Sequence, residues 1–305
     1  MSAREARFGA TVDNEVWTPL KLLKWTAEYF KKHDVEEPRL DAELLLANVL
    51  GVDRIMLYAG FERVIGDDEL KAFRGHVKER AAGRPAKYIL GRTEFYSLAL
   101  RVDERVLIPR PETELVVERT LSILKDRGAG EFPLVVEIGT GSGGIAIALA
   151  KNFVEANYVA TDVSADALSL ARENAKANGV EGKIEFLKGD LLEPLVTMGL
   201  EGKVDVIVSN PPYVSEDAWR TLRREIREHE PKLALVAGPE GTEIQARIID
   251  EARNFLRPGG ALLEEMDSQQ KEALGKAAAR IEGYAVPVFY QDYAKLWRVV
   301  ELVRL

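Results

Sequence analysis

Cysteine is absent from the 305-residue sequence, and histidine occurs only three times. The chain therefore forms no disulfide, zinc–cysteine site or thiol nucleophile, and the composition fits a reducing compartment. Positive charge is also scarce, because 42 Lys and Arg against 50 Asp and Glu give a net charge of −8. This balance argues against a protein that coats nucleic acid by bulk charge, although it leaves room for a local basic groove.

Long hydrophobic runs are also missing, since no stretch of 18 or more apolar residues occurs, and none is expected to span a membrane. The first 17 residues are polar and charged, without the apolar segment of a secretory signal. We therefore expect a cytoplasmic protein. The chain is nevertheless 46% apolar, which suffices for a sizeable core, and its length predicts about two domains.

The first part of the chain has helical patterns only. Thr18 followed by Pro19 is typical of a helix start, and apolar residues then recur at three- and four-residue spacing. A second helix is expected from near Pro38 to Gly51, and a third from near Asp67 to before Gly83. These segments predict a small helical bundle.

The pattern changes at residues 84–112, where Gly and Pro punctuate short strand-like segments, and we interpret this stretch as a linker with a β-hairpin. From residue 133 onward, strands alternate with helices, which predicts a parallel sheet covered by helices on both faces. Two final strands, near residues 286–290 and 297–302, have no helix between them, so the last strand is expected to be antiparallel. The predicted division is a helical domain 1–83, a linker 84–112 and a catalytic domain 113–305.

A glycine-rich loop, residues 139–143, follows a buried strand and opens a helix. Glycine at positions 139, 141 and 143 permits a tight turn and lets a ligand approach bare backbone. Asp162 ends the next strand, where a carboxylate can accept hydrogen bonds from a ribose diol. Asp162 is equally suited to cap the following helix, and the two roles are compatible. Together the two features predict an adenosyl ligand, either NAD or S-adenosylmethionine.

The segment Asn210-Pro211-Pro212-Tyr213 (NPPY) separates these alternatives. It follows an apolar strand directly, and its two prolines make the chain rigid just past the sheet edge. The Asn210 side chain and the Pro211 carbonyl are two acceptors that can hold both hydrogens of a planar amino group. Tyr213 can stack on that group and favour positive charge on its nitrogen. The alternative, a stiff loop with a packing tyrosine, fits this position less well.

At this point the sequence resembles a known family. Glu137–Gly143 with Asn210–Tyr213 is similar to the class I S-adenosylmethionine-dependent methyltransferases that modify planar nitrogens. More narrowly, it resembles the HemK-type (PrmC) protein-glutamine N5-methyltransferases that act on peptide chain release factors. Segments 84–95, 106–114 and 230–241 also match that family. The resemblance implies a Rossmann-like α/β fold with a seven-stranded sheet and an antiparallel last strand, preceded by a small all-α substrate-docking domain.

The resemblance further implies that the enzyme methylates the glutamine amide of the release factor's GGQ motif, thereby tuning translation termination, and releases S-adenosyl-L-homocysteine. The residues implied to bind the cofactor are Glu137, Gly139, Thr140, Gly141, Ser142, Gly143, Asp162, Val163, Asp190, Leu191 and Asn210. Those implied to bind substrate are Phe95, Pro109, Arg110, Asn210, Pro211, Pro212 and Tyr213, the last four being catalytic. Simpler roles are hairpin packing for Phe95 and a surface ion pair with Glu112 or Glu114 for Arg110.

Two positions depart from the family pattern. Asp267 stands in a turn where the family usually has glycine, and the loop 292–298 has Ala294-Lys295 and no glycine, so the sequence does not predict the shapes of these two loops. No metal site is expected, because the histidines lack metal-ligand spacing.

Other functions compete with the main prediction: N5-methylation of a ribosomal-protein glutamine, methylation of a nucleic-acid base amino group, or the role of a non-catalytic adaptor. Net acidity and the absence of a target-reading domain disfavour a nucleic-acid substrate. We expect a monomer with a release factor as partner and no membrane contact.

Overall fold

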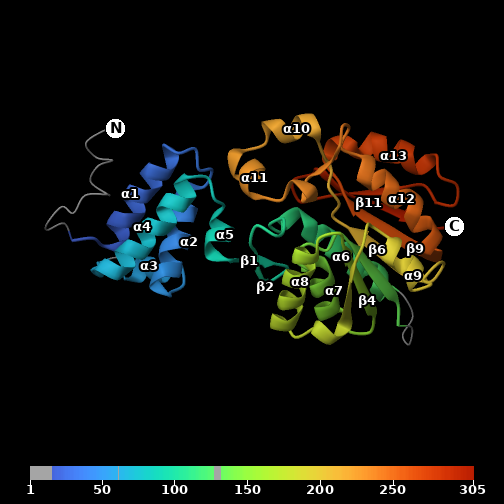
Figure 1. The fold of residues 1–305 in the computed structure, drawn as a ribbon, viewed down its shortest axis with the longest axis horizontal. Coiled ribbons are helices and arrows are strands. Elements are labelled where there is room, and N and C mark those ends of the chain that lie inside the picture. The colour runs from blue at the N-terminus through green and yellow to red at the C-terminus, as the bar shows by residue number, and fades with distance from the viewer. Residues whose placement is uncertain (1–15, 61, 127–131) are drawn as a thin grey trace. The chain divides into compact units, whose positions relative to one another are not determined.

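A computed structural model of the chain describes residues 16–60, 62–126 and 132–305. The chain divides into two compact units, Met1–Leu90 and Gly91–Leu305 (Figure 1). Segment 84–112 contributes a short helix to the first unit and a hairpin to the second. Among the residues that the structure describes, no helix is long and apolar enough to cross a membrane. Within the same residues, no three His, Asp or Glu side chains are grouped as ligands for a metal ion.

The first unit is helical, as the sequence pattern predicts. The Thr18 hydroxyl accepts a hydrogen bond from the Lys21 N–H, Pro19 occupies the first turn, and Gly51 ends the second helix with a φ of 63°. The core of this unit contains Leu22, Phe30, Leu45, Leu46 and Phe73, all fully buried. The helices are α1 (Pro19–Lys31), α2 (Pro38–Leu50), α3 (Met56–Ala59), α4 (Asp67–Ala81) and α5 (Ala86–Leu90).

The second unit begins with an antiparallel hairpin and continues into a seven-stranded sheet of order β10-β11-β9-β6-β3-β4-β5. Strand β11 pairs antiparallel with both of its neighbours, whereas β3, β4, β5, β6 and β9 are parallel. The prediction of an α/β sheet with an antiparallel last strand is therefore confirmed. The hairpin is β1 (Arg92–Phe95) and β2 (Leu98–Arg101); the sheet strands are β3 (Leu134–Ile138), β4 (Asn157–Asp162), β5 (Ile184–Lys188), β6 (Val204–Ser209), β9 (Leu256–Glu265), β10 (Val288–Gln291) and β11 (Trp297–Val303).

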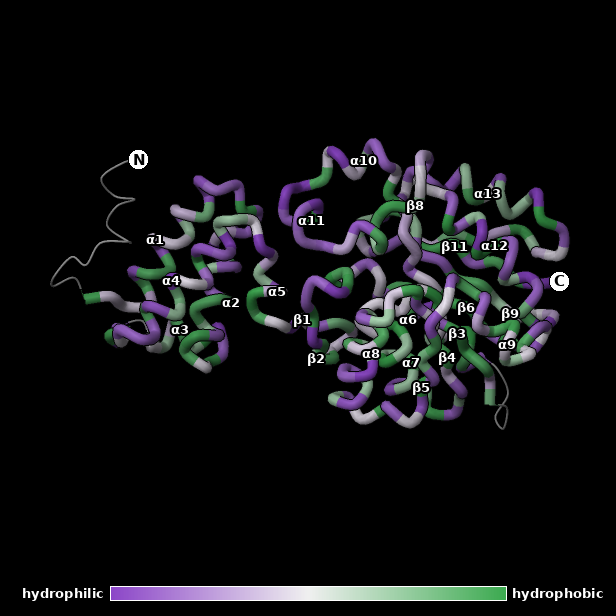
Figure 2. Tube along the Cα trace, in the orientation of Figure 1, coloured by the Kyte–Doolittle hydropathy of each residue, from purple (hydrophilic) through white to green (hydrophobic). Residues whose placement is uncertain are grey.

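Helices cover both faces of this sheet (Figure 1). On one face, α6 (Glu114–Lys125), α7 (Gly144–Asn152) and α8 (Ala165–Ala177) contribute to one buried cluster; on the other, α9 (Glu193–Thr197), α12 (Glu243–Phe255) and α13 (Lys271–Ala279) contribute to a second. Strands β3 and β6 supply apolar residues to both clusters, which is why they are coloured hydrophobic in Figure 2. A strand buried on both faces has a continuous apolar sequence rather than an alternating one.

Several short elements carry no periodicity that a sequence pattern could detect. Strands β7 (Val214–Ser215) and β8 (Val236–Gly238) form a two-stranded parallel sheet. The chain between them forms α10 (Glu216–Thr221) and α11 (Arg224–His229). Helix α11 and the end of α10 make up most of the charged stretch 220–230, and α11 is coloured hydrophilic in Figure 2. The single-turn 3₁₀ helices are η1 (Pro111–Thr113), η2 (Glu181–Lys183), η3 (Lys232–Ala234) and η4 (Ser268–Gln270).

The strand order places several loops at one sheet edge. After β3 the chain forms β4 and β5 on one side, then returns to form β6 on the other side of β3. The carboxyl ends of β3, β4 and β6 therefore meet at a switch point, where ligands of open α/β sheets bind. The glycine loop follows β3, Asp162 ends β4, and the NPPY segment follows β6.

Candidate functional site

The glycine loop joins β3 to α7 and adopts a backbone that favours glycine. Gly139, Gly141 and Gly143 have φ angles of 69°, 54° and 83°. A Cβ at Gly139 or Gly141 would meet no atom within 4 Å, so these two residues border open space. At Gly143, in contrast, a Cβ would approach the Ile147 side chain to 2.9 Å. Two glycines thus leave room for a ligand, and the third lets the loop pack on α7.

Glu137 supports the loop from beneath. Its Oε2 accepts hydrogen bonds from the Thr140 hydroxyl at 2.6 Å and from the Ala146 N–H at 3.0 Å. Burial raises the pKa of this carboxyl to about 8, although both hydrogen bonds oppose the shift. Glu137 therefore ties the loop to the first turn of α7, and it also borders the cavity described below.

Asp162 connects β4 to the glycine loop and to α8. Its Oδ2 accepts from the Gly141 N–H at 2.9 Å, and its Oδ1 accepts from the Ser164 N–H at 2.8 Å. Burial raises the pKa of Asp162, and backbone hydrogen bonds counteract this. Ser164 itself caps α8 by accepting from the Ala167 N–H. Backbone N–H groups therefore orient the Asp162 carboxylate, and because a carboxylate can accept about four hydrogen bonds, it can still accept from a ligand.

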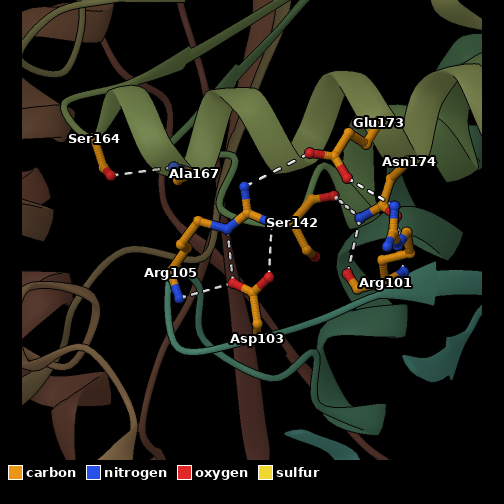
Figure 3. Close-up of polar contacts among 8 residues, drawn as sticks. All are labelled: Arg101, Asp103, Arg105, Ser142, Ser164, Ala167, Glu173 and Asn174. Atoms are coloured by element: carbon orange, nitrogen blue, oxygen red, sulfur yellow. Dashed lines mark hydrogen bonds and ion pairs between the residues drawn. The ribbon is translucent and has the colours of Figure 1, made fainter. Parts of the chain in front are cut away.

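Helix α8 holds both the hairpin and the glycine loop in place (Figure 3). The Asn174 amide exchanges hydrogen bonds with the backbone of Arg101 at 2.7 and 3.0 Å, and also donates to the Ser142 carbonyl at 2.8 Å. Glu173 pairs with Arg101 at 3.0 Å. Arg105, which borders the cavity, donates twice to Asp103, and this contact raises the pKa of its guanidinium. Arg105 also pairs with Glu173 at 3.6 Å, so α8 braces segment 101–106, of which Arg105 and Val106 border the cavity.

The third loop at this edge follows β5. Leu191 has a positive φ of 47°, which is unusual for a residue with a branched side chain, and its carbonyl accepts from the Thr161 hydroxyl at 2.9 Å. Asp190 accepts from Arg247 at 2.9 Å. Both Asp190 and Leu191 border the cavity, so the loop presents an apolar side chain and a paired carboxylate.

The NPPY segment lies at the end of β6. Asn210 Nδ2 donates to the Thr113 hydroxyl at 3.1 Å. The Tyr213 hydroxyl donates to Glu265 Oε1 at 3.1 Å, and burial raises the pKa of Tyr213, so it stays an uncharged phenol. The Gln270 amide donates to the Tyr213 carbonyl at 2.9 Å. The segment is thus held at its side chains by Thr113 and Glu265, and at its backbone by Gln270.

These loops enclose a cavity of about 240 Å³. It is bordered by thirteen of the residues that the sequence singles out: Phe95, Pro109, Glu137, Gly139, Thr140, Gly141, Ser142, Asp162, Val163, Asp190, Leu191, Asn210 and Pro212. The other four, Gly143, Pro211, Tyr213 and Arg110, do not border it. Phe95 is also a core residue with 2% exposure, so packing and cavity contact coincide there.

Arg110 has an ion-pair partner that the sequence analysis does not name. Its guanidinium donates to Glu230 at 2.6 Å, rather than pairing with Glu112 or Glu114. Glu230 also accepts from the Ile108 N–H at 3.2 Å. A partner 120 residues away leaves no local signal in the sequence.

Sequence reasoning also missed Thr113, Glu265 and Gln270. Thr113 lies inside segment 106–114, which resembles the family, but no motif marks Thr113 or Glu265 as neighbours of Asn210 and Tyr213. Thr113 is 5% exposed and Glu265 is 2% exposed. The sequence feature that could have identified Glu265 is its place as a polar residue at the end of the apolar strand β9.

Two family models match the chain. The PrmC N-terminal domain matches residues 21–91, and the methyltransferase small domain matches residues 120–233. The release factor glutamine methyltransferase of Chlorobaculum tepidum is 44% identical over 292 residues, covering 94% of this chain and 97% of that protein. The chain belongs to the release factor glutamine methyltransferase family. The predicted family, and a methyltransferase as the enzyme class, are thereby confirmed.

Other matches agree with this family. The release factor glutamine methyltransferase of Rhodopirellula baltica is 38% identical over 96% of this chain and 98% of its own length. Among solved structures, the N-terminal domain of human METTL16 in complex with SAH covers 78% of this chain and 82% of that structure, with a TM-score of 0.50 and 18% identity. At that identity the likeness concerns the fold alone, and it agrees with the sheet described above.

Proposed function

We propose that this release factor glutamine methyltransferase family member transfers a methyl group from S-adenosyl-L-methionine to the side-chain amide nitrogen of a glutamine in a peptide chain release factor. The observation that carries the proposal is the position of Asn210, which directly follows β6 and borders the same cavity as the glycine loop and Asp162. An amide-binding group and a nucleoside-binding edge thus share one cavity, in a chain whose relatives bear this name.

The cavity residues fit the cofactor. Gly139 and Gly141 leave open space at the loop, where the amino-acid portion would lie against bare backbone. The Asp162 carboxylate, oriented by two backbone N–H groups, would accept from the ribose hydroxyls. Asp190 and Leu191 would border the adenine, and Leu191 supplies the apolar contact. When bound, the cofactor supplies an electrophilic methyl group on a sulfonium.

The remaining residues would hold the substrate amide. Asn210 Oδ1 and the Pro211 carbonyl would accept its two hydrogens, which orients the nitrogen and localises its lone pair. Tyr213 would support the positive charge that develops on nitrogen. With the nitrogen held in this way, its attack on the methyl carbon would form the N–C bond as the S–C bond broke, and the nitrogen would then lose a proton to solvent. No general base is needed, because the methylated nitrogen is strongly acidic before that loss.

Other parts of the proposal concern the rest of the chain. We propose that the helical domain, residues 1–83, docks the protein substrate, and that the enzyme is a cytoplasmic monomer. A ribosomal-protein glutamine stays the closest alternative substrate. A nucleic-acid amino group is less favoured, given the net charge of −8 and the names of the relatives.

The test is a labelling assay with the full-length chain and methyl-labelled S-adenosylmethionine. The substrates are a release factor, the same factor with its target glutamine replaced by alanine, a ribosomal protein and a nucleic acid. Label is expected in the intact release factor alone. Equal labelling of the alanine variant would refute glutamine as the acceptor, and label confined to the ribosomal protein or the nucleic acid would refute the release factor.

A further inference from the structure

The loop that follows β5 is tightly folded. A Cβ at Gly189 would overlap the Pro194 ring, so only glycine fits there, and the chain turns back on itself between these two residues. The Glu193 N–H closes the turn by donating to the Asp190 carbonyl at 3.0 Å. Inside the turn, Leu191 has a φ of 47°, in the left-handed region that is sterically unfavourable for a residue with a side chain. A left-handed leucine persists only where its surroundings hold it.

Thr161 supplies such a contact from the end of β4. This residue is fully buried, and its hydroxyl donates to the Leu191 carbonyl at 2.9 Å. The main chain of β4 adds a second anchor, because the Gly189 N–H donates to the Asp162 carbonyl at 3.1 Å. The Thr161 carbonyl also accepts from the Thr140 N–H of the glycine loop at 3.0 Å. Thr161 therefore holds the glycine loop through its backbone and the loop after β5 through its side chain.

The conformation of Leu191 decides what this loop offers to the cavity. Leu191 and Asp190 both border the cavity, and the Leu191 side chain also packs against the buried cluster to which α12 contributes. In the part of the chain that the structure describes, the Leu191 N–H has no hydrogen-bond partner, and Asp190 pairs with Arg247 through Oδ2 alone. Rotation of φ to negative values would turn the peptide group of Leu191 and shift its side chain from that cluster.

We propose that Thr161 is a positioning residue that keeps Leu191 left-handed, and with it the part of the cavity wall that receives the adenine of S-adenosylmethionine. This inference rests on the proposed function, because that function assigns the adenine to this loop. Without the Thr161 hydroxyl, Leu191 spends part of its time at negative φ, and the apparent affinity falls with the fraction of molecules that keep the binding conformation. Thr161 acts on cofactor binding and not on the reacting atoms.

The first test compares single substitutions by calorimetric titration with S-adenosylmethionine. Thr161→Val keeps the shape of the side chain and removes the hydroxyl, whereas Thr161→Ser keeps the hydroxyl. Thr120→Val is the matched control, since it removes another fully buried hydroxyl, which donates to the Val116 carbonyl. We expect Thr161→Val to weaken the affinity about fivefold, the value of one hydrogen bond, and to keep kcat at saturating cofactor close to the wild-type value. Thr161→Ser should recover most of the affinity, and Thr120→Val should match the wild type.

Leu191→Gly then shows whether Thr161 acts through the backbone of residue 191. Glycine adopts a positive φ without the steric cost, so it does not need the hydrogen bond to stay left-handed. In the Leu191→Gly background, Thr161→Val is therefore expected to have almost no further effect on the affinity. The same loss in both backgrounds would overturn the inference, because Thr161 borders the cavity and its hydroxyl would then act on the cofactor directly. Wild-type affinity in Thr161→Val would overturn it as well.

The remaining outcomes are also assigned. If Thr161→Val does not fold, Thr161→Ala takes its place in the same cycle and is judged by the same two results. Because the readout is cofactor binding, the cycle is separate from the labelling assay. A wild-type chain that binds S-adenosylmethionine and methylates no glutamine would refute the proposed function alone, whereas a wild-type chain that binds no S-adenosylmethionine would refute both.

Discussion

The Arg110 guanidinium donates to Glu230 Oε1 at 2.6 Å, and the other oxygen of Glu230 accepts from the Ile108 N–H at 3.2 Å. One side chain with 2% exposure thereby joins two chain segments that both border the cavity. Glu230 therefore ties the segment before α6 to the segment after α11.

Replacing Glu230 by alanine should destabilise the protein. The Ile108 N–H loses its partner and Arg110 loses its ion pair, although the Arg110 side chain is 30% exposed and can recover some hydration. We expect the free energy of unfolding to fall by about 2 kcal/mol, measured by urea denaturation. The control is Glu228→Ala, which removes an exposed pair with Arg224 and should unfold like the wild type. Equal stability of both variants would contradict the bracing role of Glu230.

Asn210→Ala should separate catalysis from cofactor binding. The substitution removes the acceptor for the substrate amide, so kcat is expected to fall at least a hundredfold, by analogy with the loss of a transition-state hydrogen bond. The affinity for S-adenosylmethionine, measured by calorimetry, should stay nearly the same. Asp162→Ala, in contrast, should act mainly on cofactor binding and weaken the affinity for S-adenosylmethionine about tenfold or more. Full methylation of a release factor by Asn210→Ala would contradict the assigned role.

Glu137 should make stability depend on pH. Its pKa is about 8 in the folded protein against an ordinary value of 4.5, because burial disfavours the charged form. Between these two pKa values, Glu137 keeps a proton in the folded state that it has lost in the unfolded state. The contribution of Glu137 to the free energy of unfolding therefore falls as pH rises, by at most about 1.4 kcal/mol per pH unit. Glu137→Gln keeps an acceptor for Thr140 and cannot titrate. Urea denaturation from pH 5 to pH 8 should therefore show a shallower decline for Glu137→Gln, and parallel curves would speak against the shift.

Lys295 occupies a backbone position that favours glycine. Its φ is 65°, in the turn between β10 and β11 where the family usually has glycine. A left-handed conformation costs a non-glycine residue about 1–2 kcal/mol, and glycine recovers this at the expense of about 0.4–1 kcal/mol of unfolded-chain entropy. Lys295→Gly is therefore expected to raise the free energy of unfolding by about 0.5–1 kcal/mol. Lys295→Ala is the control and should bring no gain; a destabilised Lys295→Gly would show that the lysine side chain matters.

The second departure from the family pattern, Asp267, has a different explanation. Its carboxylate accepts from the Gln269 N–H at 2.9 Å, and the Gln270 side chain accepts from the Asp267 N–H at 3.0 Å. Asp267 therefore caps η4 and orients Gln270, which donates to the Tyr213 carbonyl. The loop that lacks glycine supports the NPPY backbone through this cap.

Local features of this protein could be predicted from the sequence alone. Helix starts such as Thr18-Pro19, the glycine loop and the strand before Asn210 depend on residues close together in the chain, whose propensities and spacing act directly. The C-terminal hairpin followed likewise from the lack of a helix between two strands. Short helices such as α3, α5 and α9 escaped prediction, because one or two turns carry too little periodicity.

Only the tertiary structure decided which side chains meet. Arg110 pairs with a residue 120 positions away, and Asn210 contacts one 97 positions away. The strand order β9-β6-β3 brings Glu265, Asn210 and the glycine loop to one sheet edge, and η1 places Thr113 beside them. Propensity acts over a few residues, whereas burial forces distant polar groups to satisfy one another. The sequence by itself therefore determined the chemical groups at the site, and packing determined how they are oriented.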